Sequence, residues 1–309
     1  MDTKINYSII IPHKNIPELL RRCLDSIPRR DDVQIIVVDD NSDPGKADFE
    51  HFPGLGDPCV EVVFAKEGKG AGYARNVGLT KAVGNWLLFA DADDYFTNGF
   101  MEYLDNYKNS NYDLIYFGIN GVNAKKRQEN SSSRKLNKLM RDAIFRKKYD
   151  IYKYTVYVVW GKMINQSFVK ENNIIFDETK VVNDLMFSIK TSYYAKNIFF
   201  DEHRIYTYEI RLDSLTSNKT AEANFDRFCV TMRYNIFLKN MAQKKIRKNV
   251  IISLCRLIDI RNMEYFYKGI ELIKQNNINL FIEFIEFCIL IPYQIIIKIN
   301  NILFDRYIA

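Results

Sequence analysis

Short apolar runs alternate with amphipathic segments over the first part of the chain. The runs are residues 7–11, 34–38, 60–65 and 86–90, each rich in β-branched or large apolar side chains. Runs of this length followed by turn-forming residues are typical of buried strands. Apolar side chains recur at helical spacing over residues 17–27, and a further helix is expected to begin at residues 71–73. This alternation predicts an α/β fold, a mostly parallel sheet flanked by helices.

Polar clusters follow two of these predicted strands directly. The first is Asp39, Asp40, Asn41, Ser42 and Asp43, and the second is Asp91, Ala92, Asp93 and Asp94. Ligands of parallel sheets bind beyond the carboxyl ends of the strands, so we expect the carboxylates to surround one site. Asp91 and Asp93 suit a divalent cation that bridges two phosphates, although an isolated pair of this spacing is more often a turn or a helix cap. Arg75, near a predicted helix start, is placed to face phosphate or a nucleobase.

From about Tyr112 the pattern changes to mixed short strands and helices. A Lys- and Ser-rich stretch, residues 123–138, is interpreted as a mobile loop. After Ser217 the chain is mainly helical. The helices predicted there are residues 225–239, 250–258 and 265–274. We therefore expect one domain over residues 1–217, with halves 1–100 and 101–217, and a helical C-terminal region over residues 218–309.

The apolar C-terminal segment, residues 281–307, is interrupted by charged residues and a proline. Its longest uncharged piece, residues 287–297, is shorter than the roughly 17–25 residues that a membrane-spanning helix needs. A basic run at residues 244–248 precedes it. Two interpretations stay open: the segment lies in a membrane interface, held by apolar burial and anionic headgroups, or it packs on the protein.

Composition and charge narrow the function only slightly. The 309 residues carry a formal net charge of +6, compatible with an anionic nucleotide, an acidic lipid surface or nucleic acid. The basic residues are dispersed and no base-stacking motif is recognisable, so a nucleic-acid module is disfavoured. The five cysteines are far apart without a CxxC pair, which predicts reduced thiols. The first residues lack the apolar stretch of a secretory signal, which favours a cytoplasmic location for the protein.

Four motifs in order resemble the family 2 glycosyltransferases, which have the GT-A fold. They are Ser8-Ile9-Ile10-Ile11-Pro12 with Asn15, Ile35-Ile36-Val37-Val38-Asp39-Asp40-Asn41-Ser42, Ala74-Arg75-Asn76-Val77-Gly78, and Asp91-Ala92-Asp93-Asp94. Further segments resemble the acceptor side of that family. They are Val159-Trp160-Gly161-Lys162-Met163, Asn183-Asp184-Leu185-Met186-Phe187, and Tyr206 to Arg211 with Ser214. The resemblance covers about residues 5–217.

The resemblance implies a metal-dependent, inverting glycosyltransferase with a Rossmann-like GT-A domain. Residues 1–100 would then bind a nucleotide-sugar, most simply a UDP-sugar, and residues 101–217 a glycan or lipid-linked acceptor. The implied context is bacterial cell-surface polysaccharide, such as capsule or lipopolysaccharide, with the enzyme cytoplasmic or peripheral on the inner membrane face. The implied site comprises Asp184 as general base; Pro12, Asn15, Asp39, Asp40, Ser42, Arg75 and Asp91 at the nucleotide; Asp93 and Asp91 at Mn²⁺ or Mg²⁺; and Trp160 and Asn183 at the acceptor.

The chain departs from the family pattern in two places. Asn183 stands where the family usually has Glu, and His13-Lys14 replaces the more usual Thr-Tyr. We interpret His13 and Lys14 as solvated loop residues, the alternative being a cation near the nucleotide. Trp160 has an alternative interpretation as a core residue. The other histidines, His51 and His203, have no partner recognisable from the sequence.

Two other functions stay open. A nucleotidyltransferase also uses a Rossmann-like sheet with carboxylate-held metal, but it would show a Gly-rich loop after the first strand, where this chain has Pro12-His13-Lys14-Asn15. A non-catalytic nucleotide-sugar-binding scaffold of a membrane glycan-assembly complex needs no base. Retention of both Asp93 and Asp184 favours the enzyme.

Overall fold

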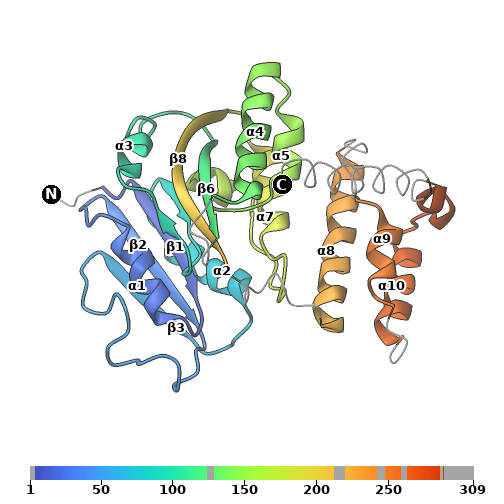
Figure 1. Cartoon of the computed structure of the whole chain (residues 1–309), viewed down its shortest axis with the longest axis horizontal. Coiled ribbons are helices and arrows are strands. Elements are labelled where there is room, and N and C mark those ends of the chain that lie inside the picture. The colour runs from blue at the N-terminus through green and yellow to red at the C-terminus, as the bar shows by residue number, and fades with distance from the viewer. Residues whose placement is uncertain are drawn as a thin grey trace, which may run out of the picture. The chain divides into compact units, whose positions relative to one another are not determined.

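The computed structural model describes residues 4–123, 129–211, 220–241, 248–258, 263–285 and 288. The chain divides into two compact units, Met1–Ser217 and Asn218–Ala309. Figure 1 shows the helices and strands of both units.

The first unit is built on an eight-stranded sheet with the strand order β3-β2-β1-β4-β7-β6-β8-β5. The strands are β1 Tyr7–His13, β2 Val33–Asp40, β3 Val60–Ala65, β4 Trp86–Phe89, β5 Tyr95–Phe96, β6 Leu114–Asn123, β7 Lys162–Asn165 and β8 Ile198–Ile210. The first four are parallel neighbours, β7 runs antiparallel between β4 and β6, and β6 pairs parallel with β8. Both kinds of pairing occur, and the predicted α/β fold with a Rossmann-like first half is confirmed.

Helices cover both faces of this sheet. In chain order they are α1 Pro17–Asp25, α2 Ala71–Lys81, α3 Phe100–Asp105, α4 Ser131–Arg146, α5 Asp150–Thr155, α6 Gln166–Glu171 and α7 Leu185–Tyr194. Alternate strand residues point to opposite faces, so Ile9 packs in one apolar cluster with Leu20 of α1, and Ile10 packs in another with Ala74 of α2. Burial on both faces explains why the central strands are continuous apolar runs.

The predicted strands and helices of the first half agree with the structure to within two residues at each end. The prediction of a mobile loop over residues 123–138 is wrong in its second half, because α4 begins at Ser131. Asn130 caps this helix by accepting a hydrogen bond from the Ser133 amide at 2.8 Å. Met140 and Ala143 bury one face of the helix. The Lys and Ser content concealed this apolar face. Residues 124–128 of the predicted loop lie outside the described residues.

The parallel strands carry their loops to one edge of the sheet, where α2 begins unusually close to a distant segment. A Cβ atom at Gly72 would lie 2.0 Å from the Asp177 carbonyl oxygen and 2.9 Å from Asn183 Cβ. Only glycine permits this approach. It brings the segment that precedes α7 against the first turn of α2.

The second unit contains α8 Ala221–Asn240, α9 Val250–Cys255 and α10 Glu264–Gln275, so the predicted helical character is confirmed for its described part. The three helices pack around a small apolar cluster that includes Phe228, Leu254 and Ile273. All five cysteines of the chain are free thiols, as predicted.

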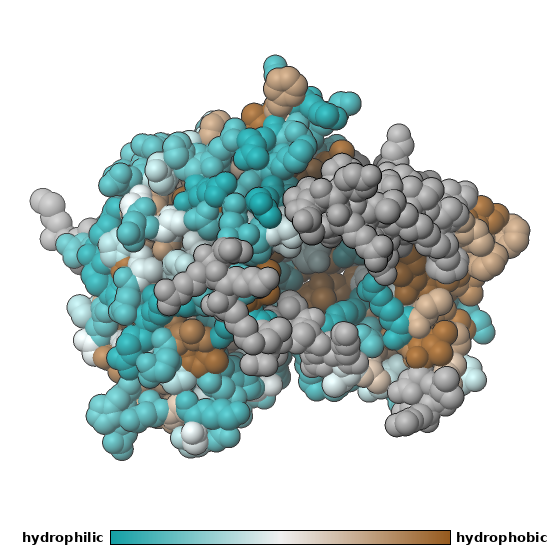
Figure 2. All heavy atoms as spheres, viewed as in Figure 1, coloured by the Kyte–Doolittle hydropathy of each residue, from teal (hydrophilic) through white to brown (hydrophobic). Residues whose placement is uncertain are grey.

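The surface of the second unit carries hydrophobic patches (Figure 2). Phe281 is 71% exposed and Phe284 is 52% exposed. No helix within the described ranges combines the length and apolarity needed to cross a membrane. Most of the predicted interface segment, residues 281–307, and residues 244–247 of the basic run lie outside the described residues.

We predict that Gly72→Ala lowers the free energy of unfolding of the first unit by roughly 1–3 kcal/mol, because the added methyl group overlaps the Asp177 carbonyl. Urea denaturation followed by tryptophan fluorescence measures this unit alone, since both tryptophans, Trp86 and Trp160, lie in it. The control is Gly45→Ala, where the new Cβ meets only Asp43 Oδ1 at 3.4 Å. Equal unfolding free energies for the two variants would contradict the prediction.

Candidate active site

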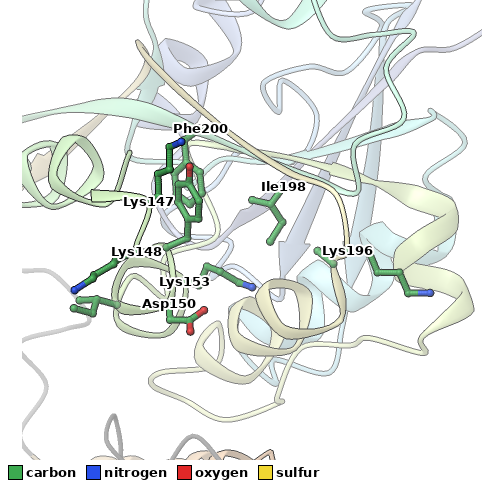
Figure 3. Close-up of a pocket in the computed structure, with 10 residues that line it drawn as sticks. Lys147, Lys148, Asp150, Lys153, Lys196, Ile198 and Phe200 are labelled. Carbon is green, nitrogen blue, oxygen red and sulfur yellow. The ribbon is translucent and has the colours of Figure 1, made fainter. Parts of the chain in front are cut away.

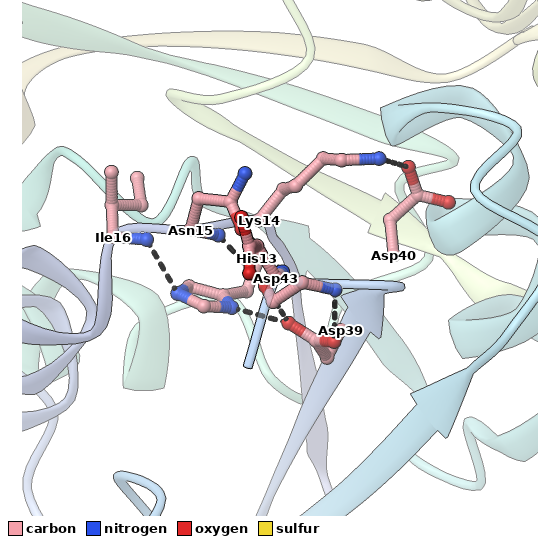
Figure 4. A network of polar contacts seen from close by, with 8 residues as sticks. His13, Lys14, Asn15, Ile16, Asp39, Asp40 and Asp43 are labelled. Atoms are coloured by element: carbon pink, nitrogen blue, oxygen red, sulfur yellow. Dashed lines mark hydrogen bonds and ion pairs between the residues drawn. The ribbon is translucent and has the colours of Figure 1, made fainter. Parts of the chain in front are cut away.

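His13 and Asp39 form a buried pair where β1 and β2 end side by side. They are aligned in the parallel register, and His13 Nδ1 lies 2.7 Å from Asp39 Oδ1. The Ile16 amide donates to His13 Nε2 at 3.1 Å, so we assign the ring proton to Nδ1, which donates to Asp39 (Figure 4). His13 is only 2% exposed. The interpretation of His13 as a solvated loop residue is therefore wrong, because both ring nitrogens have partners inside the protein.

Asp39 uses most of its hydrogen-bonding capacity inside the protein. Besides His13, the Ser42 amide donates to Oδ2 at 2.9 Å and the Ser42 hydroxyl donates to Oδ1 at 2.5 Å. Burial tends to raise the pKa of Asp39, but the hydrogen bonds from His13 and Ser42 outweigh burial and hold the pKa below its usual value. Asp39 thus stays ionised and joins the ends of the two strands.

Asp40, the next residue, keeps one oxygen without a partner. Its Oδ2 accepts hydrogen bonds from the Gly70 amide at 2.9 Å and from the Lys14 ammonium at 3.2 Å. Its Oδ1 is buried and has no hydrogen-bond partner. A buried carboxylate oxygen left unpaired is costly, so a donor group from a ligand would be favoured here. Lys14, whose side chain is 47% exposed, covers this carboxylate from the solvent side.

The loops after β1 and β2 are joined by Asn15 and Ser42. The Asn15 amide donates to Ser42 Oγ at 2.7 Å, and the Asp43 amide donates to Asn15 Oδ1 at 2.7 Å. Asn15 has a φ of 61°, a left-handed conformation that asparagine tolerates better than most residues. Pro12 lies buried in β1 opposite Val38. These residues fix both loops around Asp40.

Three carboxylates gather after β4. Asp91, Asp93 and Asp94 each offer an oxygen, and the three oxygens lie within 4.8 Å of one another. Asp94 is buried, and its oxygens accept from the Glu209 amide at 2.8 Å and the Tyr206 hydroxyl at 2.9 Å. Burial raises the pKa of Asp94 well above its usual value, and the charges of Asp91 and Asp93 add to this rise. The site concentrates negative charge.

This carboxylate set fits a divalent metal ion. Oxygen ligands of this kind suit Mg²⁺ or Mn²⁺. Burial raises the pKa of Asp93, and the charge of Asp91 adds to the rise while Arg211 opposes it. Asp91 and Asp93 have side chains 33% and 28% exposed, whereas both oxygens of Asp94 already accept hydrogen bonds. Asp91 and Asp93 are therefore better placed than Asp94 to hold the ion.

Arg75, in the first half of α2, connects this cluster to the segment before α7. One terminal nitrogen donates to Asp91 Oδ1 at 2.6 Å and the other donates to Asn183 Oδ1 at 2.7 Å. Arg75 is 5% exposed, and its guanidinium lies over the Phe176 ring at 5.4 Å. Asn183 thus offers its amide oxygen to the guanidinium, at the position where the family usually has a carboxylate. Arg75 brings together two segments far apart in the sequence.

Asp184 stands at the N-cap of α7, directly after Asn183. Burial raises the pKa of Asp184 to about 6; Arg75 opposes this rise, and the charge of Asp91 adds to it. Lys162 of β7 lies nearby and is 2% exposed, and burial lowers its pKa to about 7 while Asp184 opposes that shift. Lys162 stands in a segment expected on the acceptor side, but no role for its side chain was predicted. Its Nζ donates to Ser188 Oγ of α7 at 3.2 Å and so links β7 to the helix.

Trp160 stacks on two tyrosines of β8. Its ring lies 5.4 Å from the ring of Tyr206 and 5.0 Å from that of Tyr208. The Tyr206 hydroxyl also accepts a hydrogen bond from the Asp91 amide at 2.8 Å, so Tyr206 contacts both Trp160 and the acidic cluster. Trp160 is partly exposed. Both the core role and the predicted acceptor role are compatible with this position.

Two arginines contact Asp93. Arg22 of α1 donates to the Asp93 carbonyl at 2.5 Å, and Arg211, after β8, forms an ion pair with the Asp93 carboxylate. Arg22 also pairs with Glu209 at 2.9 Å. Sequence analysis placed Tyr206 and Glu209 in a segment that resembles the acceptor side but predicted no contact with the acidic cluster for them or for Arg22. They are far from Asp93 along the chain, and no local spacing signals the contact.

The other histidines have carboxylate partners, contrary to the reading from the sequence. His51 Nδ1 lies 2.8 Å from Asp48 Oδ2, and His203 Nδ1 lies 2.6 Å from Asp201 Oδ1. Both partners are within three residues in sequence, a spacing that turns bring into contact. These pairs do not take part in the acidic cluster.

Comparison with known proteins gives one family match. The model of glycosyl transferase family 2 matches residues 8–172. Among curated relatives, the uncharacterized glycosyltransferase EpsJ of Bacillus subtilis is 23% identical over 215 residues, which are 68% of this chain and 62% of EpsJ. The poly(ribitol-phosphate) beta-glucosyltransferase of Bacillus spizizenii is 26% identical over 67% of this chain and 32% of its own length. The chain thus spans less than two thirds of either relative.

A solved structure shares the fold. Residues 1–349 of S. aureus TarS, crystallised with UDP-GlcNAc, align with a TM-score of 0.61 and 20% identity over 84% of this chain and 73% of that one. The GT-A fold expected from the sequence is confirmed.

We predict that Asp39→Asn lowers the free energy of unfolding by roughly 1–3 kcal/mol at pH 7, because a buried charged acceptor of three hydrogen bonds is lost. The pKa of Asp39 is lower in the folded state than in the unfolded state. The contribution of Asp39 to the free energy of unfolding is therefore complete above the unfolded pKa of about 3.9 and is lost as pH falls through the folded value. The difference between wild type and variant should therefore narrow below about pH 3.9. Urea titrations at several pH values measure it, and a difference that widens in acid would contradict this account.

Proposed function

The chain belongs to glycosyl transferase family 2, and from this we propose that it is a metal-dependent, inverting enzyme that transfers a sugar from a nucleotide-sugar to a glycan or lipid-linked acceptor. The observation that carries the proposal is the double contact of Arg75 with Asp91 and Asn183, which holds the acidic cluster beside Asp184. A donor-side acidic cluster and a partly buried carboxylate of raised pKa, joined by one arginine, suit a displacement at a carbon that bears a phosphate leaving group.

Asp40 is the residue we assign to the nucleobase. Its free oxygen, buried beneath Lys14, is an acceptor for a base N–H such as that of uracil. Asp39, Asn15 and Ser42 act mainly by fixing the loops that hold Asp40 in place. A UDP-sugar is the donor class that we propose, in line with the UDP-GlcNAc bound to TarS.

Asp91 and Asp93 would hold Mn²⁺ or Mg²⁺. When bound, the ion would neutralise charge on the departing nucleoside diphosphate and so lower the barrier to its departure. Arg75 adds a fixed positive charge at the same place, and its buried position keeps that charge aimed at the cluster. Arg22 and Arg211 orient Asp93 through its carbonyl and its carboxylate.

Asp184 is the proposed general base. With a pKa of about 6 it is largely ionised at neutral pH, yet basic enough to take a proton from an acceptor hydroxyl. As the proton moves to Asp184, the hydroxyl oxygen forms its bond to the anomeric carbon while the bond to the diphosphate breaks. Attack from the face opposite the leaving group inverts the configuration at that carbon.

The acceptor class is proposed from chemistry and from the relatives together. The poly(ribitol-phosphate) beta-glucosyltransferase relative suggests a hydroxyl-rich cell-surface polymer or its lipid-linked precursor. Trp160 offers a partly exposed aromatic ring near the cluster, suited to a sugar face. We therefore place the enzyme in bacterial surface-polymer assembly at the inner face of the membrane.

We predict that Asp184→Asn lowers the transfer rate by roughly 10²–10⁴-fold, because the amide cannot accept the proton. Binding of the donor should stay within about threefold of wild type, since Asp184 does not contact the donor in this mechanism. Single-turnover transfer and nucleotide titration measure the two properties. The matched control is Asp142→Asn, a residue of α4 whose side chain is 43% exposed and pairs with Lys138.

The pH profile gives a second readout of the same assignment. Below about pH 6 the carboxyl of Asp184 holds its proton in the folded enzyme, so kcat should rise with pH through that value. In Asp184→Asn the residual rate should lose this limb. Retention of the limb in the variant would assign the titration, and the base, to another group.

The proposed function as a whole is tested by thermal stabilisation with nucleoside diphosphates and nucleotide-sugars, with and without Mn²⁺. A ligand at 100 times its dissociation constant stabilises the folded state by about 2.7 kcal/mol, which raises the melting temperature of a unit of this size by roughly 5–10 °C. We expect a Mn²⁺-dependent shift with one nucleotide-sugar, lost in Asp93→Ala and kept in Asp142→Ala. The absence of any nucleotide-dependent shift in wild type would contradict the proposed function and favour a degenerate protein that keeps the fold without the chemistry.

A further inference from the structure

A second concave site lies in the first unit, away from the acidic cluster. It has a volume of about 600 Å³ and is lined by the end of α4, by α5 and by the turn between α7 and β8 (Figure 3). Four lysines surround it, Lys147, Lys148, Lys153 and Lys196, against one carboxylate, Asp150. The remaining lining is largely apolar and includes Ile198 and Phe200. We call it the lysine pocket.

The positive charge of the lysine pocket is only partly compensated by the protein. Within the described ranges, no ion pair joins any of the four lysines to a carboxylate. Lys153 lies 5.5 Å from the ring of Tyr154, and burial lowers its pKa while Asp150 opposes that shift. Charges of one sign around a concave, partly apolar surface concentrate the field and attract anions.

The arrangement of the lysines fits several anions better than one. In Figure 3, Lys147, Lys148, Lys153 and Lys196 lie on different sides of the pocket and their amino groups do not converge on one point. A single compact phosphate would draw such groups together. Ammonium groups spread around a rim instead match an array of phosphates, such as the headgroups of a lipid surface.

Exposed apolar side chains accompany these lysines. Phe145, two residues before Lys147, is 90% exposed, Ile151 is 55% exposed and Tyr149 is 39% exposed. A soluble polyanion would offer these groups no apolar partner. A membrane interface accommodates both kinds of side chain at once, with cations at the phosphates and apolar groups in the acyl boundary.

We propose that the lysine pocket docks the first unit on an anionic phospholipid surface. Headgroup phosphates lie against the four lysines, and Phe145 and Ile151 enter the interface. The inference deepens the proposed function, and it rests on that function for its purpose, which is to bring the enzyme to a lipid-linked acceptor.

Helix α7 connects the lysine pocket to the proposed base. Asp184 occupies the N-cap position of this helix, and Ala195 and Lys196 of the pocket follow its C-terminus. Ten residues of α-helix span about 15 Å. Docking at one end of α7 therefore holds the base at a set distance from the lipid surface, within reach of an acceptor that carries several sugar units.

The test is sedimentation of the full chain with vesicles of phosphatidylcholine and phosphatidylglycerol, compared with vesicles of phosphatidylcholine alone. Wild type should bind only the anionic vesicles, and the double variant Lys147→Gln/Lys148→Gln should bind them roughly tenfold or more weakly. Phe145→Ser should weaken binding about fivefold. The control, Lys4→Gln/Lys170→Gln, removes the same charge from exposed lysines elsewhere and should bind within about twofold of wild type.

Three results would overturn the proposal. In the first, wild type fails to bind anionic vesicles. In the second, wild type binds them and the two double variants weaken binding equally. In the third, Lys147→Gln/Lys148→Gln weakens binding of soluble polyphosphate but not of vesicles, which assigns the pocket to a polyanion. Thermal stabilisation by nucleotide-sugar is measured on the same proteins and should be equal in all of them. If nucleotide-sugar does not stabilise wild type, the proposed function is contradicted. The vesicle experiment still tests the docking surface independently.

Discussion

One buried guanidinium holds the candidate site together. Arg75 binds Asp91, which follows β4, and Asn183, which precedes α7, so it fixes the distance between the acidic cluster and Asp184. The arginine reaches both because α2 starts against the 177–183 segment, an approach that Gly72 alone allows. The negative charges around it in turn make burial of the cation tolerable. Neither the arginine nor the carboxylates would be stable in these positions alone.

The same coupling explains the electrostatics of Asp184. Burial and the charge of Asp91 raise its pKa, whereas Arg75 limits the rise. A neutral Asn183 beside it adds no further negative charge, whereas a carboxylate in that position would compete for the guanidinium. The replacement of the usual glutamate is thus compatible with a base that is ionised near neutral pH. Asp39 and Asp40 also differ in their hydrogen bonding. The carboxylate of Asp39 accepts hydrogen bonds from His13 and Ser42, whereas one oxygen of Asp40 has no partner.

The sequence predicted what depends on local pattern. Apolar runs placed the first four strands, and polar clusters after them placed Asp40, Asp91 and Asp93 at one sheet edge. Contacts between distant segments left no local signal: the Asp39–His13 pair is made by the register of β1 on β2, and the Tyr206 bonds to Asp94 and Asp91 come from β8. Helix α4 was missed because its lysines and serines hide a narrow apolar face. The lysine pocket was not predicted, because Lys196 lies far along the chain from Lys147, Lys148 and Lys153, and no local pattern shows that they line one hollow.

The place of β7 in the sheet affects how this architecture can evolve. Strand β7 follows β6 in the chain, yet it pairs both with β6 and with β4 of the first half, so both halves share one continuous sheet and two common apolar layers. An exchange of one half between homologues as a cassette would cut that sheet through its middle and require a new interface to be repacked. Diversity among such enzymes is therefore expected to accumulate in the loops beyond the strand ends, where residues change without repacking the interior.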